Sequence, residues 1–155
     1  MRLWLAPVLA CPVLACIALS ACQLPSPDKD ADALAKRFIG EVASGADLSK
    51  DPSIDPQLSG AAFQVQRDGL KAMFPKPAPD KVNSTGWSVN AKMGEGSRAE
   101  LRYSYVYGAS TVALTAVLRK PEGKTQWVAT GLRGIKDAGP VTLGEAPDTD
   151  AGGGD

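Results

Sequence analysis

The chain has 155 residues, of which 44% are hydrophobic and 22% charged, which is typical of one globular domain and not of a disordered or fibrous protein. Lys and Arg together number 17, as do Asp and Glu, so no overall charge attracts an anionic partner. The basic residues are scattered along the chain. We therefore expect no nucleic-acid binding.

Cysteine and histidine usage restricts the chemistry further. The three cysteines, Cys11, Cys16 and Cys22, precede the main body of the chain, and there is no histidine. The body therefore lacks a disulfide, a thiolate zinc site and a cysteine nucleophile. It also lacks the commonest general base and metal ligand. We expect no catalytic residue, no metal and no cofactor.

An apolar run fills residues 3–19, behind the single positive side chain of Arg2, and leads into Leu19-Ser20-Ala21-Cys22. This order resembles a bacterial lipoprotein signal peptide, and the four residues match its lipobox. The resemblance implies that residues 1–21 are removed and that Cys22 becomes a lipid-modified (palmitate-bearing) N-terminus. An uncleaved membrane helix is the alternative, but the run barely reaches the length of about 20 residues that a bilayer requires.

The residues after the cysteine suggest where the protein is anchored. Lipoproteins with Asp after the cysteine stay at the inner membrane, whereas this chain has Gln23 there. The resemblance therefore implies the cell outer membrane, with the domain facing the periplasm. Residues 22–30 contain Pro25 and Pro27 and are predicted to be a tether, which reaches at most roughly 25–30 Å. Weaker lipobox matches end at Cys11 and Cys16. Cleavage before either of them would leave apolar sequence at the start of the mature chain, so Cys22 is the better site.

Helical spacing of apolar residues predicts two helices at the start of the body. In residues 31–44 the stripe consists of Leu34, Phe38 and Val42. The second helix, over residues 57–74, has Asp55 as its cap and Pro56 at its first position. Its predicted apolar positions are Leu58, Ala62, Val65, Leu70 and Met73.

From Ser84 the apolar residues alternate, which predicts four antiparallel strands joined by short turns. The clearest strand is residues 99–107, where Glu100 and Arg102 face away from the core as ordinary surface charges. The fourth strand, residues 125–135, contains Trp127. Residues 138–155 are predicted to be a disordered acidic tail, so truncation after Lys136 is expected to leave stability nearly unchanged.

The order of two helices and then strands, together with the closing strand Trp127-Val128-Ala129-Thr130-Gly131-Leu132, resembles the nuclear transport factor 2-like superfamily over residues 31–137. The resemblance implies an α+β fold in which two N-terminal helices pack on a curved four-stranded antiparallel sheet, forming a cone. A cystatin-like domain is the alternative. Neither implies an activity, because such folds host enzymes, carriers and non-catalytic modules.

Five aromatic residues are the candidate pocket lining in such a cone: Trp87, Tyr103, Tyr105, Tyr107 and Trp127. They could surround a small apolar ligand, but we favour core packing. An isomerase-like relative would need a carboxylate among the inward residues, and the inward positions from Ala99 to Tyr107 include no acid. Gly94–Ala99 matches a dinucleotide-binding pattern but is interpreted as a hairpin turn, because a strand follows it.

The sequence therefore predicts an outer-membrane lipoprotein with a non-catalytic envelope or binding role. A carrier or sensor of a small hydrophobic ligand is the first alternative, and a divergent isomerase-like or cyclase-like enzyme is the second. The predicted partners are the membrane, through the lipid on Cys22, and either an envelope protein or a small apolar ligand.

Overall fold

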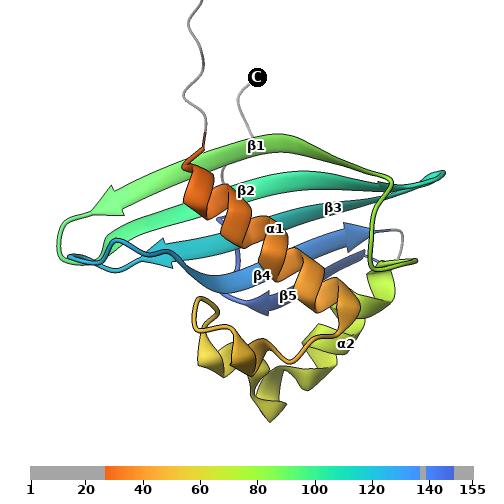
Figure 1. The fold of residues 1–155 in the computed structure, drawn as a ribbon, viewed down its shortest axis with the longest axis horizontal. Coiled ribbons are helices and arrows are strands. Elements are labelled where there is room, and N and C mark those ends of the chain that lie inside the picture. The colour runs from red at the N-terminus through yellow and green to blue at the C-terminus, as the bar shows by residue number, and fades with distance from the viewer. Residues whose placement is uncertain (1–26, 137–138, 149–155) are drawn as a thin grey trace, which may run out of the picture.

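A computed structural model describes residues 27–136 and 139–148 of the chain. Two α-helices and three short 3₁₀ turns precede a run of strands (Figure 1). The helices and turns are α1 (Lys29–Ser44), η1 (Leu48–Lys50), η2 (Pro56–Ser59), η3 (Ala61–Phe63) and α2 (Gln64–Met73). The strands are β1 (Lys81–Lys92), β2 (Gly96–Tyr107), β3 (Ser110–Lys120), β4 (Val128–Lys136) and β5 (Gly139–Gly144). The class is α+β, as predicted.

The strands form one open antiparallel sheet in the order β1-β2-β3-β4-β5. Both helices lie on the same face of the twisted sheet, with α1 crossing it diagonally and α2 beside β4 and β5 (Figure 1). We call this the helix-covered face and the opposite one the open face. The core lies between the sheet and the helices.

Helix α1 forms as the sequence predicts and begins two residues earlier. Asp28 caps it, since its Oδ1 accepts a hydrogen bond from the Asp30 amide at 2.9 Å. Gly45 ends it in the left-handed conformation, with φ of 73°. The predicted apolar stripe is buried against the sheet.

The second predicted helix is divided. Asp55 caps its start and Pro56 occupies the first position, as predicted, but the chain then makes two 3₁₀ turns before α2 begins. Gly60 separates the two turns with an extended backbone, ψ 158°, which interrupts the helical hydrogen bonding. One consequence is that Val65, predicted to be on the buried side, is 80% exposed.

The prediction of four strands is wrong, because β5 adds a fifth strand beside β4. Leu143 of β5 lies opposite Leu132 and is fully buried. The prediction of a disordered tail over residues 138–155 is therefore wrong for residues 139–148. The sequence did not predict this strand because only two of its residues, Val141 and Leu143, show the alternation of apolar residues. They stand between Pro140 and Gly144, which are more typical of a loop. Trp127 lies just before β4 and not within it.

Candidate functional site

The candidate pocket residues of β2 are part of the core. Tyr103 is 1% exposed, Tyr105 5% and Tyr107 6%, and all three belong to the hydrophobic cluster under the helices. The rings of Tyr103 and Tyr105 meet edge to face with centroids 6.3 Å apart, and Phe74 meets Tyr107 in the same way. Their side chains fill the space that a ligand would need.

A carboxylate does lie beside the tyrosines, and it comes from helix α1. The Tyr103 hydroxyl donates to Asp32 Oδ1 at 2.8 Å, and Lys36 Nζ lies 2.7 Å from Asp32 Oδ2. Burial, and then the hydrogen bond to Asp32, raise the pKa of the Tyr103 hydroxyl well above its usual value. Both carboxylate oxygens of Asp32 therefore have partners, and the contact between Asp32 and Tyr103 joins helix α1 to the sheet. Sequence reasoning missed Asp32 because it searched only the inward face of the strand.

The two candidate tryptophans differ in burial. Trp87 of β1 is half-buried and packs against the edge of the core. Trp127 is 6% exposed, and its Nε1 donates to Asp28 Oδ2 at 3.0 Å. That hydrogen bond is the largest cause of the lowered pKa of Asp28. Trp127 borders a shallow groove beside α1, but its indole N–H is used to fix the start of the helix.

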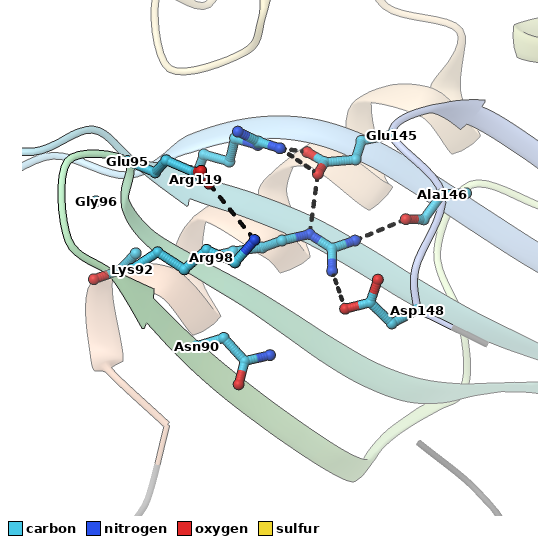
Figure 2. Close-up of a pocket in the computed structure, with 10 residues that line it drawn as sticks. Asn90, Lys92, Glu95, Gly96, Arg98, Arg119, Glu145, Ala146 and Asp148 are labelled. Atoms are coloured by element: carbon cyan, nitrogen blue, oxygen red, sulfur yellow. Dashed lines mark hydrogen bonds and ion pairs between the residues drawn. The ribbon is translucent and has the colours of Figure 1, made fainter. Parts of the chain in front are cut away.

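A second group of side chains lies on the open face, and we call it the open-face charge cluster: Arg98, Glu100, Arg119, Glu145 and Asp148. It joins β2 and β3 to the segment after β5 (Figure 2). Arg98 Nε lies 3.0 Å from Glu145 Oε1, and its Nη1 lies 2.6 Å from Asp148 Oδ2. Arg119 binds Glu145 through two nitrogens, at 2.7 and 2.8 Å.

The segment 145–148, which we call the C-terminal strap, runs from β4 toward β2 across this face. The Glu145 amide donates to the Thr130 carbonyl at 2.9 Å, and the Asp148 amide donates to Glu100 Oε1 at 2.8 Å. Arg98 Nη2 also donates to the Ala146 carbonyl at 2.7 Å, as Figure 2 shows. The strap is therefore attached to three strands of the sheet.

The strap changes the environment of Glu100. This residue, predicted to be a surface charge, is 2% exposed, and its neighbour across the strands, Val117, is fully buried. Glu100 Oε1 lies 2.8 Å from Arg98 Nη1, while its Oε2 has no hydrogen-bond partner among the described residues. Arg102 Nη2 does lie 3.7 Å from Glu100 Oε2, but the surface-charge interpretation is wrong because Glu100 is buried and bound by Asp148 of the strap, which the sequence did not predict.

The two arginines and Thr130 favour the charged form of Glu145. Hydrogen bonds from Arg119, then from Thr130, lower the pKa of Glu145 to about 2, with added attraction from both arginines. A groove of about 330 Å³ beside the cluster is also lined by Asn90, Lys92 and Glu95 (Figure 2). The two guanidinium groups are already bound by carboxylates of the same chain. The cluster therefore acts chemically as a clamp for the strap.

The sequence contained a weak signal for this cluster. Arg98, Glu100 and Arg102 alternate on one face of β2, and Glu145 and Asp148 are acids of the segment predicted to be a tail. Their charges are complementary, but Arg98 lies 47 residues before Glu145 and 50 residues before Asp148, and no local pattern joins them.

Comparison with protein-family models, with curated proteins and with solved structures gave no match. Neither helix of the described ranges, 27–136 and 139–148, has the length and hydrophobicity to cross a bilayer. Cys22, the predicted lipidation site, and the signal peptide before it lie outside the described residues.

Proposed function

We propose that the chain is an outer-membrane lipoprotein, acylated on Cys22, whose domain faces the periplasm and acts as a non-catalytic envelope or binding module. The observation that carries the proposal is the lipobox Leu19-Ser20-Ala21-Cys22 behind an apolar run. The position of the domain agrees with it, because helix α1 is capped by Asp28, only six residues after the cysteine. A folded domain directly after a short polar tether suits an anchored protein.

The packing of the helix-covered face supports the non-catalytic role. The tyrosines that a carrier would need for its ligand are closely packed against one another and Phe74. The nearest carboxylate, Asp32, is bound by Tyr103 and Lys36 instead of facing an open cavity. We therefore favour an envelope or binding module over the carrier and the isomerase-like enzyme.

We further propose that the domain is a nuclear transport factor 2-like cone with one added strand. Two helices on one face of a twisted antiparallel sheet support this, and β5 extends the predicted four-stranded sheet at its β4 edge. This resemblance implies the shape of the domain but no activity.

The lipid anchor is tested by labelling cells with radioactive palmitate and separating their membranes. The wild-type protein should carry label and sediment with the outer membrane. Cys22→Ser should abolish the label, because the acylated thiol is gone. Cys16→Ser is the matched control and should leave both label and location unchanged. If Cys22→Ser keeps its label, the anchor is elsewhere and the proposal is wrong.

A further inference from the structure

Hydrogen bonding fixes the start of the domain at one end of the sheet. Asp28 accepts a hydrogen bond from Trp127, and Lys120 Nζ lies 4.8 Å from the centre of the Trp127 ring. Lys120 is the last residue of β3 and pairs with Ser97, near the start of β2. The chain therefore enters the fold close to the end of the sheet where β2 begins and β3 ends.

The β1–β2 turn, residues 93–95, lies at this same end (Figure 1). Gly96 follows the turn with φ of 87° and packs so tightly on the end of β3 that an added Cβ would lie 2.2 Å from the Lys120 carbonyl oxygen. We call the β1–β2 turn and the β3–β4 loop, residues 121–127, the entry end. The β2–β3 turn, Gly108 and Ala109, lies at the other end of β2, about 36 Å away at 3.3 Å per residue.

The proposed anchor limits how far the entry end is from the membrane. The six residue steps from Cys22 to Asp28 span at most about 20 Å, even when fully extended. This length is little more than half the distance between the two ends of β2. The entry end is therefore held near the bilayer, and the β2–β3 turn is not held in this way.

The entry end also carries exposed apolar side chains. Met93 in the turn is 100% exposed, and Val89, which lies in β1 shortly before the entry end, is 42% exposed. Lys92, Lys120 and Lys124 lie in or next to the two loops of the entry end, as do Glu95 and Glu122, and Lys92 Nζ is 3.7 Å from Glu95 Oε2. Charge is nearly balanced, so contact with lipid would come from the apolar side chains, with lysine ammonium groups at headgroup level.

From this geometry we propose that the entry end rests on the phospholipid bilayer, with Met93 and Val89 in the interfacial region. The inference depends on the proposed anchor at Cys22. It orients the molecule: the β1–β2 turn faces lipid, and the β2–β3 turn points toward the periplasmic space. Because charge is nearly balanced, the contact should form on zwitterionic lipid and change little with salt.

The test places single labels at the two ends of the sheet. Cys11 and Cys16 leave with the signal peptide and the Cys22 thiol is acylated, so Met93→Cys and Ala109→Cys each provide one free thiol. Acylated variants are labelled with a polarity-sensitive fluorophore and reconstituted in phosphatidylcholine vesicles carrying a lipid-bound quencher. The label at position 93 should shift to the blue and lose most of its emission, whereas the label at position 109 should change little.

The outcomes separate this inference from the anchor proposal. Flotation of the same vesicles and the mass of the N-terminal peptide show first whether the protein is anchored through Cys22. If the protein is not acylated, the proposed function and this inference both fail. If it is acylated and floats but positions 93 and 109 are quenched equally, or position 109 more strongly, the anchor stands and the orientation is wrong.

Discussion

Strand β2 buries its whole row of side chains from Ala99 to Tyr107 on the helix-covered face but only Glu100 on the open face, and the two faces are held by different forces. On the helix-covered face, tyrosines and aliphatic residues pack against helices that are close in sequence to one another. On the open face, Arg98 and Glu100 are covered by four residues from the other end of the chain. One strand can therefore support an apolar layer on one face and an ionic layer on the other.

The two layers should also differ in how they respond to conditions. Apolar burial on the helix-covered face contributes stability that depends little on pH or salt. The open-face charge cluster depends on the Glu145 carboxylate staying ionised, and removal of the arginine that contacts the buried Glu100 should destabilise the fold. Variants of each layer should therefore lose different amounts of stability.

Truncation after Lys136 should have the largest effect, because it removes both β5 and the strap. The fully buried Leu143 is lost and Glu100 and Val117 become exposed, so the free energy of unfolding should fall by more than about 5 kcal/mol. Urea unfolding measures this. Truncation after Asp148 is the matched control and should be neutral. A neutral result for the longer truncation would mean that β5 and the strap do not pack on the sheet.

Tyr105→Ala should destabilise the helix-covered face by about 3–5 kcal/mol, because a buried aromatic ring is replaced by a cavity. Ser104→Ala, on the open face of the same strand, is the control and should change stability by less than about 0.5 kcal/mol. Chemical denaturation compares the two. A small effect at Tyr105 would show that its ring is not part of the core.

Arg98→Ala should cost about 2–3 kcal/mol, because it leaves the Glu100 carboxylate buried without its closest cation. The double variant Arg98→Met with Glu100→Leu should recover most of this loss, since it removes both charges and keeps the volume. Thermal unfolding of the single and double variants gives the comparison. A double variant as unstable as Arg98→Ala would show that the charge of Glu100 is not the cause.

Glu145 should make the free energy of unfolding depend on pH in the acid range. Its pKa is about 2 in the folded protein, below the ordinary value of 4.5, because Arg119 and Thr130 donate hydrogen bonds to it. The stability that this carboxylate contributes is therefore present above pH 4.5 and is lost as the pH falls toward 2. Glu145→Gln should be less stable than wild type at pH 7, and the two unfolding curves should converge near pH 2. A constant difference between them would contradict this.

The smallest predicted effect separates two tyrosine hydroxyls. Tyr103→Phe removes the hydrogen bond to Asp32 and should cost about 1 kcal/mol. The Tyr107 hydroxyl is buried with no hydrogen-bond partner among the described residues, so Tyr107→Phe should be neutral or slightly stabilising. Equal losses from the two variants would show that the Asp32 contact contributes nothing.

The sequence predicted the parts of the fold that local patterns determine. The apolar stripe of α1, the cap Asp55 with Pro56 after it, and the alternation around Tyr103 are each visible within a few neighbouring residues. Their burial follows from helical and strand periodicity. Core packing of the tyrosines, the interpretation we favoured, agrees with their burial.

The remaining features depend on contacts between distant residues. Glu100 is bound by Asp148, which lies 48 residues later in the chain, and Tyr103 donates its hydrogen bond to Asp32, 71 residues earlier. The short β5 is stabilised by pairing with β4 and by burial of Leu143, neither of which a six-residue pattern reveals. The lipid at Cys22 stays a prediction from the lipobox.

The central claim, a lipid anchor at Cys22, is tested most directly by mass spectrometry of the protein extracted from membranes. We expect a mature chain that begins at Cys22, with acyl chains on that residue and none elsewhere. A chain that retains residues 1–21 with an unmodified Cys22, or one that carries its lipid on Cys16, would contradict it.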